Sequence, residues 1–259
     1  MGLGLPGHQL GPDDAPITLV EWSDFACKFC NQESSVISQV HAKYGDQVRI
    51  VYRHFPLHHD SELAAEAGVA AAAQGKFWPF ADQVWAHFGQ LTRGDLEQYA
   101  QAAGVDLVPF RAALDDHRYR DVVAAEGAAA SAGNFGGTPT LFLDGHPISG
   151  ALPADRLDKL IDRELARAQA AIAAGIAPRD LYAIEMSAAG GSERVDPAQI
   201  PTAAAMHMEP TAAERERSVA AACRRRDAAM AHALASALTE MSRKRLAGVC
   251  ATEGVDLDW

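Results

Sequence analysis

Two apolar segments that flank one amphipathic segment constrain the fold of this 259-residue chain most strongly. Residues 15–25, APITLVEWSDF, are rich in β-branched and apolar residues, which indicates a strand buried on both faces. Residues 47–57, QVRIVYRHFPL, have the same character. Between them, residues 31–45 show helical apolar spacing and end at Gly45, a residue typical of helix C-termini. A strand, a helix and a strand in this order predict a right-handed unit with parallel strands.

Residues 60–133 have a different pattern, with no convincing strand and about four helical stretches bounded by capping residues, glycine or proline. Extended structure returns at residues 138–150, TPTLFLDGHPISG, where Asp144-Gly145 predicts a hairpin turn. Residues 153–175 then carry an apolar stripe at helical spacing. The fold class is therefore α/β, with a four-stranded mixed sheet and an inserted helical block at about 60–133.

The remaining segments flank this core, which we place at residues 16–175. Residues 1–15 are expected to be a lead-in loop, and residues 176–210, rich in Gly, Pro and Ser, a connector. Residues 211–259 are expected to form a helical C-terminal extension, opened by a capping box in TAAE.

Composition narrows the classes of partner. The formal net charge of −11 lacks the basic footprint that nucleic-acid binding requires. No segment is apolar for long enough to span a membrane. The first 16 residues lack the basic and apolar regions of a signal peptide, so the location stays open between an exported compartment and the cytoplasm.

Cys27 and Cys30 stand two residues apart after the first strand, and three interpretations compete. A zinc site normally takes four ligands, and no second close pair is present, so we expect no metal. A structural disulfide across so short a loop would constrain the unfolded chain very little. A CxxC pair next to a strand–helix–strand unit instead favours redox chemistry. Such a pair carries two electrons itself, so no further cofactor is expected.

The expected helix gives each cysteine a different environment. Cys27 would lie at the helix N-terminus, where free N–H groups and the helix dipole favour a thiolate, and Lys28 adds positive charge. Cys30, one turn further in, would be buried and placed to attack a mixed disulfide formed at Cys27.

Two further residues have a functional and a structural interpretation each. Glu21 is either a buried acid that relays a proton to or from Cys30, or an edge-facing or salt-bridged carboxylate whose partner would be Arg49 or Arg53. Pro139 is either a strand-boundary residue or a cis-proline that exposes the backbone of Thr138 to an extended substrate chain.

With these motifs on the page, the chain resembles the DsbA-like thiol–disulfide oxidoreductases of the thioredoxin superfamily over residues 10–175. The segments that carry the resemblance are LGPDDAPITLVEWSDFACKFC, VYRHFPL and GTPTLFLDG, with the helical block between them. Plain thioredoxins lack that block. The resemblance implies a thioredoxin-like fold with an inserted helical domain and these roles: Cys27 as nucleophile, Cys30 as resolving thiol, Glu21 as buried acid, and Thr138 and Pro139 as substrate contacts.

The resemblance also implies that Lys28 and Phe29 face the substrate. They replace the Pro-His of the strong oxidants, which predicts a less oxidising pair. Trp22 and Phe25 either line the site or belong to the core. The expected partners are protein thiols or disulfides and an unidentified redox recycling partner, in a periplasmic setting, with oxidase or isomerase favoured over reductase. The alternatives are a chaperone-like peptide-binding module with secondary redox activity and a glutathione-dependent small-molecule enzyme.

Cys223 and Cys250 lie 27 residues apart in the extension. On one straight helix they would be about 40 Å apart, whereas a helical hairpin would bring them together. We hypothesise a structural disulfide; the alternative is two buried free thiols.

Overall fold

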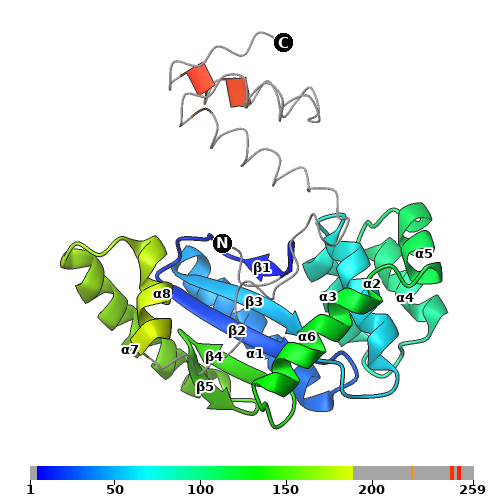
Figure 1. The fold of residues 1–259 in the computed structure, drawn as a ribbon, viewed down its shortest axis with the longest axis horizontal. Coiled ribbons are helices and arrows are strands. Elements are labelled where there is room, and N and C mark those ends of the chain that lie inside the picture. The colour runs from blue at the N-terminus through cyan, green and yellow to red at the C-terminus, as the bar shows by residue number, and fades with distance from the viewer. Residues whose placement is uncertain (1–4, 189–222, 224–245, 248–249, 252–259) are drawn as a thin grey trace. The chain divides into compact units, whose positions relative to one another are not determined.

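The computed structural model describes residues 5–188, 223, 246–247 and 250–251. The chain divides into two compact units, Met1–His207 and Met208–Trp259. The first is built on a mixed sheet with the strand order β1-β3-β2-β4-β5 (Figure 1). Its strands are β1 (Gln9–Leu10), β2 (Ile17–Ser23), β3 (Val48–His54), β4 (Thr140–Leu143) and β5 (His146–Ser149).

Helices pack on both faces of this sheet, and five of them form the insertion between β3 and β4. β2 is parallel to β3 and antiparallel to β4, as the sequence predicts. The helices are α1 (Lys28–Tyr44), followed by the 3₁₀ turn η1 (Gly45–Gln47), then α2 (Ser61–Ala72), α3 (Phe77–Ala86), α4 (Arg93–Ala102), α5 (Leu107–Asp115), α6 (Arg120–Ala132), α7 (Ala154–Ala173) and α8 (Pro178–Ala188).

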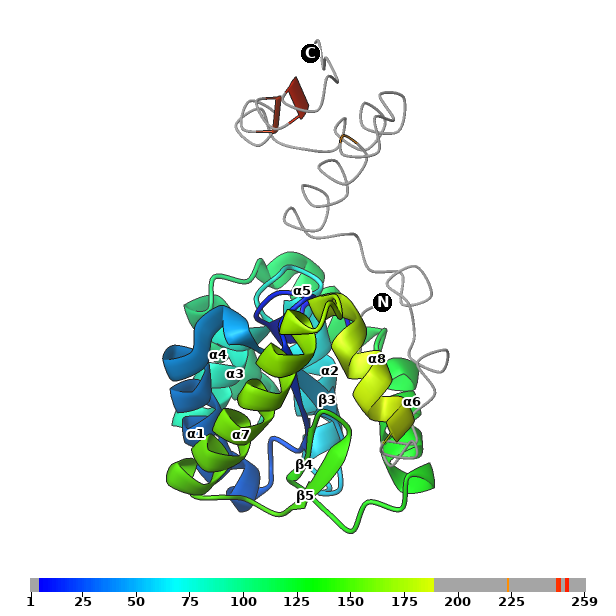
Figure 2. The same ribbon diagram turned by 90° about the vertical axis from the view of Figure 1, so that its left-hand side faces the viewer.

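The central strand β2 is buried along its whole length, so its alternate side chains pack into two separate cores, one on each face of the sheet. On one face, Leu19 packs with residues of α1 and α7. On the other, Val20 and Trp22 pack with Phe142 and with Ala130 of α6. Figure 2 shows α1 and α7 on one side of the sheet and α6 on the other. The carboxyl ends of the parallel strands β2 and β3 therefore lie side by side at one end of the sheet. The cysteine pair follows β2 at this end.

Three expectations from the sequence need correction. The lead-in loop contains β1, which pairs with β3 and makes the sheet five-stranded rather than four-stranded. The insertion has five helices rather than about four, because the chain turns at His117, whose φ of 47° lies in the left-handed region. The connector begins with α8, whose buried Leu181 joins the α1 and α7 core.

In the second unit, a disulfide joins Cys223 and Cys250, with their Cα atoms 5.0 Å apart and both side chains buried. The predicted capping box at residues 211–214 and the rest of the connector lie outside the described residues, as does most of the expected helical extension. Within the described ranges, no helix has both the length and the apolar character needed to cross a bilayer.

Candidate functional site

The loop between β2 and α1 presents Cys27 as the N-cap residue of α1. The Cys27 amide donates to the Asp24 carbonyl at 3.0 Å, and the Ala26 amide donates to Asp24 Oδ1 at 2.8 Å. These two bonds form a tight turn that sets the start of the helix. The Cys27 sulfur therefore lies at the positive end of the α1 dipole.

Cys27 contacts the loop before β4. Its Sγ lies 3.3 Å from the carbonyl oxygen of Thr138 and donates a hydrogen bond to it. The Thr138–Pro139 peptide bond is cis. The structure thus brings Cys27 next to the Thr138-Pro139 pair, which lies more than a hundred residues later in the sequence.

Cys30 lies one turn inside α1 and is fully buried. Both cysteines are thiols here. Burial, together with the nearby Glu21 carboxyl, raises the pKa of the Cys30 thiol well above its ordinary range. Cys27 and Cys30 are therefore unequal, with one sulfur at the helix end and the other in an apolar, acidic interior.

Glu21 lies on β2 and is 2% exposed. Desolvation by burial, reinforced by repulsion from Glu33, raises the pKa of Glu21 to about 8. Burial also raises the pKa of Glu33 to about 7, although its Oε2 accepts a hydrogen bond from the Leu152 amide at 3.0 Å. Tyr52, which is opposite Glu21 on β3, is buried beside it. At neutral pH the Glu21 carboxyl therefore keeps its proton and can exchange it with a neighbouring sulfur.

A cavity of about 210 Å³ leads from Glu21 and Tyr52 to the surface between α1 and α3. Among the described residues, Glu21 Oε1, Tyr52 OH, His41 Nδ1 and Trp78 Nε1 line it or point at it without a hydrogen-bond partner in the protein. These polar atoms offer hydrogen bonds to water in the cavity, and such water would give the buried acid a route for proton exchange with solvent.

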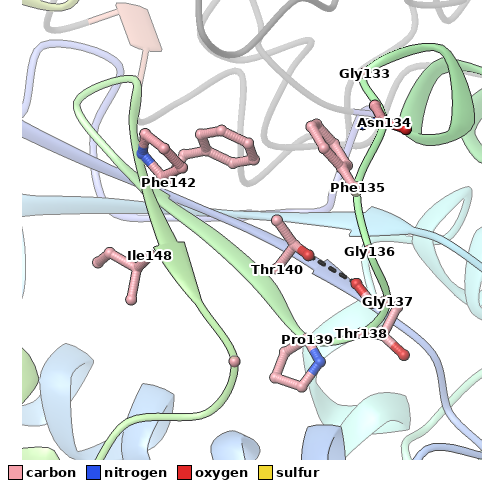
Figure 3. Close-up of a pocket in the computed structure, with 12 residues that line it drawn as sticks. Gly133, Asn134, Phe135, Gly136, Gly137, Thr138, Pro139, Thr140, Phe142 and Ile148 are labelled. Atoms are coloured by element: carbon pink, nitrogen blue, oxygen red, sulfur yellow. Dashed lines mark hydrogen bonds between the residues drawn. The ribbon is translucent and has the colours of Figure 1, made fainter.

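The loop before β4 forms a second hollow, of about 450 Å³, on the other side of Pro139 (Figure 3). The Thr140 hydroxyl donates to the Gly137 carbonyl at 2.7 Å and holds the loop closed, as Figure 3 shows. The Phe135 and Phe142 rings, 5.0 Å apart, lie across the hollow. The hollow is partly apolar, and it includes Thr138, whose carbonyl accepts the hydrogen bond from Cys27.

The other predicted site residues fall into an exposed pair and a buried pair. Lys28 and Phe29 are exposed, with the Lys28 ammonium 5.2 Å from the centre of the Phe29 ring. Trp22 and Phe25 are buried core residues, which decides between the two interpretations in favour of packing.

The alternative ion pairs of Glu21 do not form. Arg53 Nε pairs with Glu126 at 2.6 Å, and Arg49 donates to the Thr18 hydroxyl. No group of three or more His, Cys, Asp or Glu side chains with metal-binding geometry occurs in the part of the chain that the structure describes.

Sequence reasoning missed Glu33, Tyr52 and Asp24. Glu33 could have been found, because it follows Cys30 by three positions and so shares its face of the helix. Tyr52 depends on the register of β2 against β3, and Asp24 on the conformation of two loops, which no local pattern reveals.

A CxxC pair at the end of a central strand, a cis-proline loop opposite it and a helical insertion after the next strand define a thioredoxin-like protein with an inserted helical domain. The model of the family described as Thioredoxin matches residues 5–163. The chain belongs to this family.

Curated relatives share this part of the chain. The Na(+)/H(+) antiporter NhaA 3 of Salinispora tropica is 37% identical over 165 residues, which are 62% of this chain and 25% of the relative. NhaA of Herminiimonas arsenicoxydans is 37% identical over 155 residues, 60% of this chain and 25% of the relative. The chain thus spans about a quarter of the length of these relatives.

Solved structures share the fold. BdbD of Bacillus subtilis superposes with a TM-score of 0.57 at 24% identity, covering 63% of this chain and 97% of BdbD. A thioredoxin-like oxidoreductase of Silicibacter pomeroyi gives 0.54 at 26% identity, covering 60% and 90%. α-DsbA1 of Wolbachia pipientis gives 0.57 at 19% identity, covering 64% and 94%.

Proposed function

We propose that this chain is a thiol–disulfide oxidoreductase that exchanges disulfides with protein substrates. The observation that carries the proposal is the unequal cysteine pair, with Cys27 at the N-cap of α1 beside Thr138 and Cys30 buried against the Glu21 carboxyl. The pair itself carries the two electrons, so the proposal requires no cofactor.

In the oxidising direction, a substrate thiolate attacks the Cys27 sulfur of the Cys27–Cys30 disulfide. A mixed disulfide forms at Cys27, and Cys30 leaves as a thiolate. Because the pKa of Cys30 is raised well above that of Glu21, the thiolate takes the Glu21 proton. In the reverse step the Glu21 carboxylate takes the proton back from Cys30, and water in the α1–α3 cavity re-equilibrates the acid with solvent.

The substrate chain is proposed to pair with the backbone at Thr138 and Pro139, with Lys28 and Phe29 exposed beside it. We favour oxidase or isomerase over reductase. An exported, oxidising compartment such as the periplasm accords with this direction and with the disulfide between Cys223 and Cys250. A separate redox partner would restore the pair after each turnover.

The test is equilibration in glutathione buffers with the fraction of Cys27–Cys30 disulfide measured by alkylation and mass spectrometry, next to a peptide-oxidation assay. Cys30→Ser should accumulate a mixed disulfide with substrate at Cys27, and Cys27→Ser should abolish exchange. Exchange that survives Cys27→Ser would contradict the proposal and favour a peptide-binding module. A reduction potential of the Cys27–Cys30 pair near the most reducing values known for such pairs would favour a reductase.

A further inference from the structure

A histidine packs against the turn that precedes Cys27 and has no part in the step above. Asp24, three residues before Cys27, is 2% exposed. Its Oδ2 accepts hydrogen bonds from the Leu57 amide at 2.7 Å, the His58 amide at 3.1 Å and the Ser61 hydroxyl at 3.2 Å. His58 Nδ1 lies 2.8 Å from the same oxygen. The loop after β3 is therefore held directly against the turn that presents Cys27.

This contact fixes the state of the His58 ring. A carboxylate only accepts hydrogen bonds, so Nδ1 carries the hydrogen that faces Asp24. In the neutral imidazole the other nitrogen, Nε2, then has a free lone pair. The His58 side chain is 53% exposed while its Asp24 partner is fully covered. A buried carboxylate that orients an accessible imidazole makes the imidazole an efficient proton acceptor.

His58 lines a groove of about 660 Å³, and so does Ala26, the residue directly before Cys27. Apolar side chains from the insertion, among them Leu63 and Phe88, line the same groove. Phe88 is 37% exposed, a large apolar side chain open to a partner. The groove is thus an accessible approach to the turn before Cys27, lined by apolar and charged side chains, and the His58 imidazole in its wall is held by the buried Asp24 carboxylate.

The direction of thiol attack matches this approach. A thiolate attacks a disulfide sulfur in line with the bond that breaks, from the side opposite the leaving sulfur. Cys30 lies one turn inside α1, so the incoming sulfur reaches Cys27 from outside the helix N-terminus. The turn at residues 24–27 precedes the N-terminus of α1, and Ala26 in this turn is one of the residues that line the groove.

We propose that His58 is the general base that removes the proton from the incoming substrate thiol. The thiol proton passes to His58 Nε2, the thiolate forms a bond to the Cys27 sulfur, and the Cys27–Cys30 bond breaks with its electron pair on Cys30. Cys30 takes a proton from Glu21, and a second substrate thiol then releases Cys27. The substrate is oxidised by two electrons and the pair is reduced. This inference rests on the proposed function.

The pH dependence of the first step is the distinguishing property. The ionisable groups around His58 are Asp24 beneath it, its neighbours His59 and Asp60, and Arg93 from α4 across the groove. With His58 acting as base, the rate of mixed-disulfide formation gains a low-pH limb, at pH values where little of the substrate thiol is ionised. Without it, the rate follows the ionisation of the substrate thiol, with a pKa of about 8.5, and keeps rising.

The experiment is a single turnover of the full chain, oxidised beforehand with glutathione disulfide and mixed with excess reduced dithiol peptide between pH 5 and 9. Acid quenching and alkylation give the rate. His58→Gln should lower the rate at pH 7 by about tenfold or more and remove the low-pH limb of the profile. His59→Gln is the matched control, because His59 lines the same groove but its side chain is fully exposed and lies near only Asp60.

Cys27 alkylation by iodoacetamide in the reduced protein is the second readout, and His58→Gln should leave its rate within about twofold of wild type. A His58→Gln profile that keeps the wild-type limb would overturn the inference. So would a rate loss matched by an equal loss in Cys27 alkylation, which would mean that the active-site turn itself had changed. If the wild-type protein does not oxidise the peptide at all, the proposed function fails first.

Discussion

The buried Glu21 carboxyl makes the stability of the protein depend on pH in a way that can be measured. In the unfolded chain its pKa returns to 4.5, whereas in the folded protein burial holds it at about 8. Below pH 4.5 the carboxyl is protonated in both states. Between pH 4.5 and about 8 the unfolded chain has lost this proton and the folded protein retains it, so rising pH favours unfolding. Above about pH 8 the group is ionised in both states and its contribution is constant.

The size of the effect follows from the pKa difference of about 3.5. At about 1.4 kcal/mol per pKa unit, the ionisation of Glu21 costs at most about 5 kcal/mol of stability across this window. Glu21→Gln removes the ionisation and keeps the shape of the side chain. The free energy of unfolding of the variant, relative to wild type, should therefore rise by several kcal/mol between pH 5 and pH 9.

Urea denaturation of the reduced protein, followed by circular dichroism at five pH values, measures this difference. Glu33 titrates in both proteins and largely cancels in the comparison. Glu97→Gln is the control, because hydrogen bonds from Arg93 and Arg111 lower the pKa of Glu97, so it stays ionised throughout the range. Parallel curves for wild type and Glu21→Gln would refute the argument, because they would mean that Glu21 is already ionised in the folded protein at neutral pH.

Three further outcomes are expected. Glu126→Gln should destabilise the protein by about 3–5 kcal/mol in urea denaturation, since it replaces the buried carboxylate that pairs with the Arg53 guanidinium by a neutral amide. Alkylation of the unreduced, unfolded protein should leave Cys223 and Cys250 unlabelled, because they form a disulfide. Label on both sulfurs would show that this disulfide is absent. Gly11→Ala should lower the melting temperature, because its φ of 77° is strained for alanine and the new Cβ would lie 2.6 Å from a main-chain carbonyl of β3. An unchanged melting temperature would mean that the backbone relaxes there.

The parts of the fold that periodic apolar patterns specify could be predicted from the sequence. β2, β3 and the β4–β5 hairpin lie where the patterns indicate them, and so does α1, because each buries several side chains at regular spacing. β1 has only two residues, both partly buried, and exists through its pairing with β3. α8 lies in a stretch whose Gly, Pro and Ser content indicates a connector, so the packing of Leu181 in the α1 and α7 core, and not the composition, defines it.

The candidate site was predictable where chemistry follows chain order. Cys27 at the helix start and Cys30 one turn on follow directly from the spacing of the pair. The choice between the two interpretations of Glu21 needed the structure, because it depends on Arg53 pairing with Glu126 from α6. His58 stood in the sequence as one of several histidines, and only the fold of its loop onto Asp24 distinguishes it.

The position of the insertion in the sheet has a consequence for how such proteins diversify. Ser23 at the end of β2 is opposite His54 at the end of β3, and Trp22 is opposite Thr140 at the start of β4. The chain therefore leaves the sheet and returns to it on the two sides of one strand end, two interstrand spacings or about 10 Å apart. An evolving lineage could lengthen, shorten or exchange the segment between those points without altering the register of any strand. The insertion is in this sense an interchangeable module, and since its ends flank the cysteine turn, each exchange would change the surface around Cys27 and leave the turn itself intact.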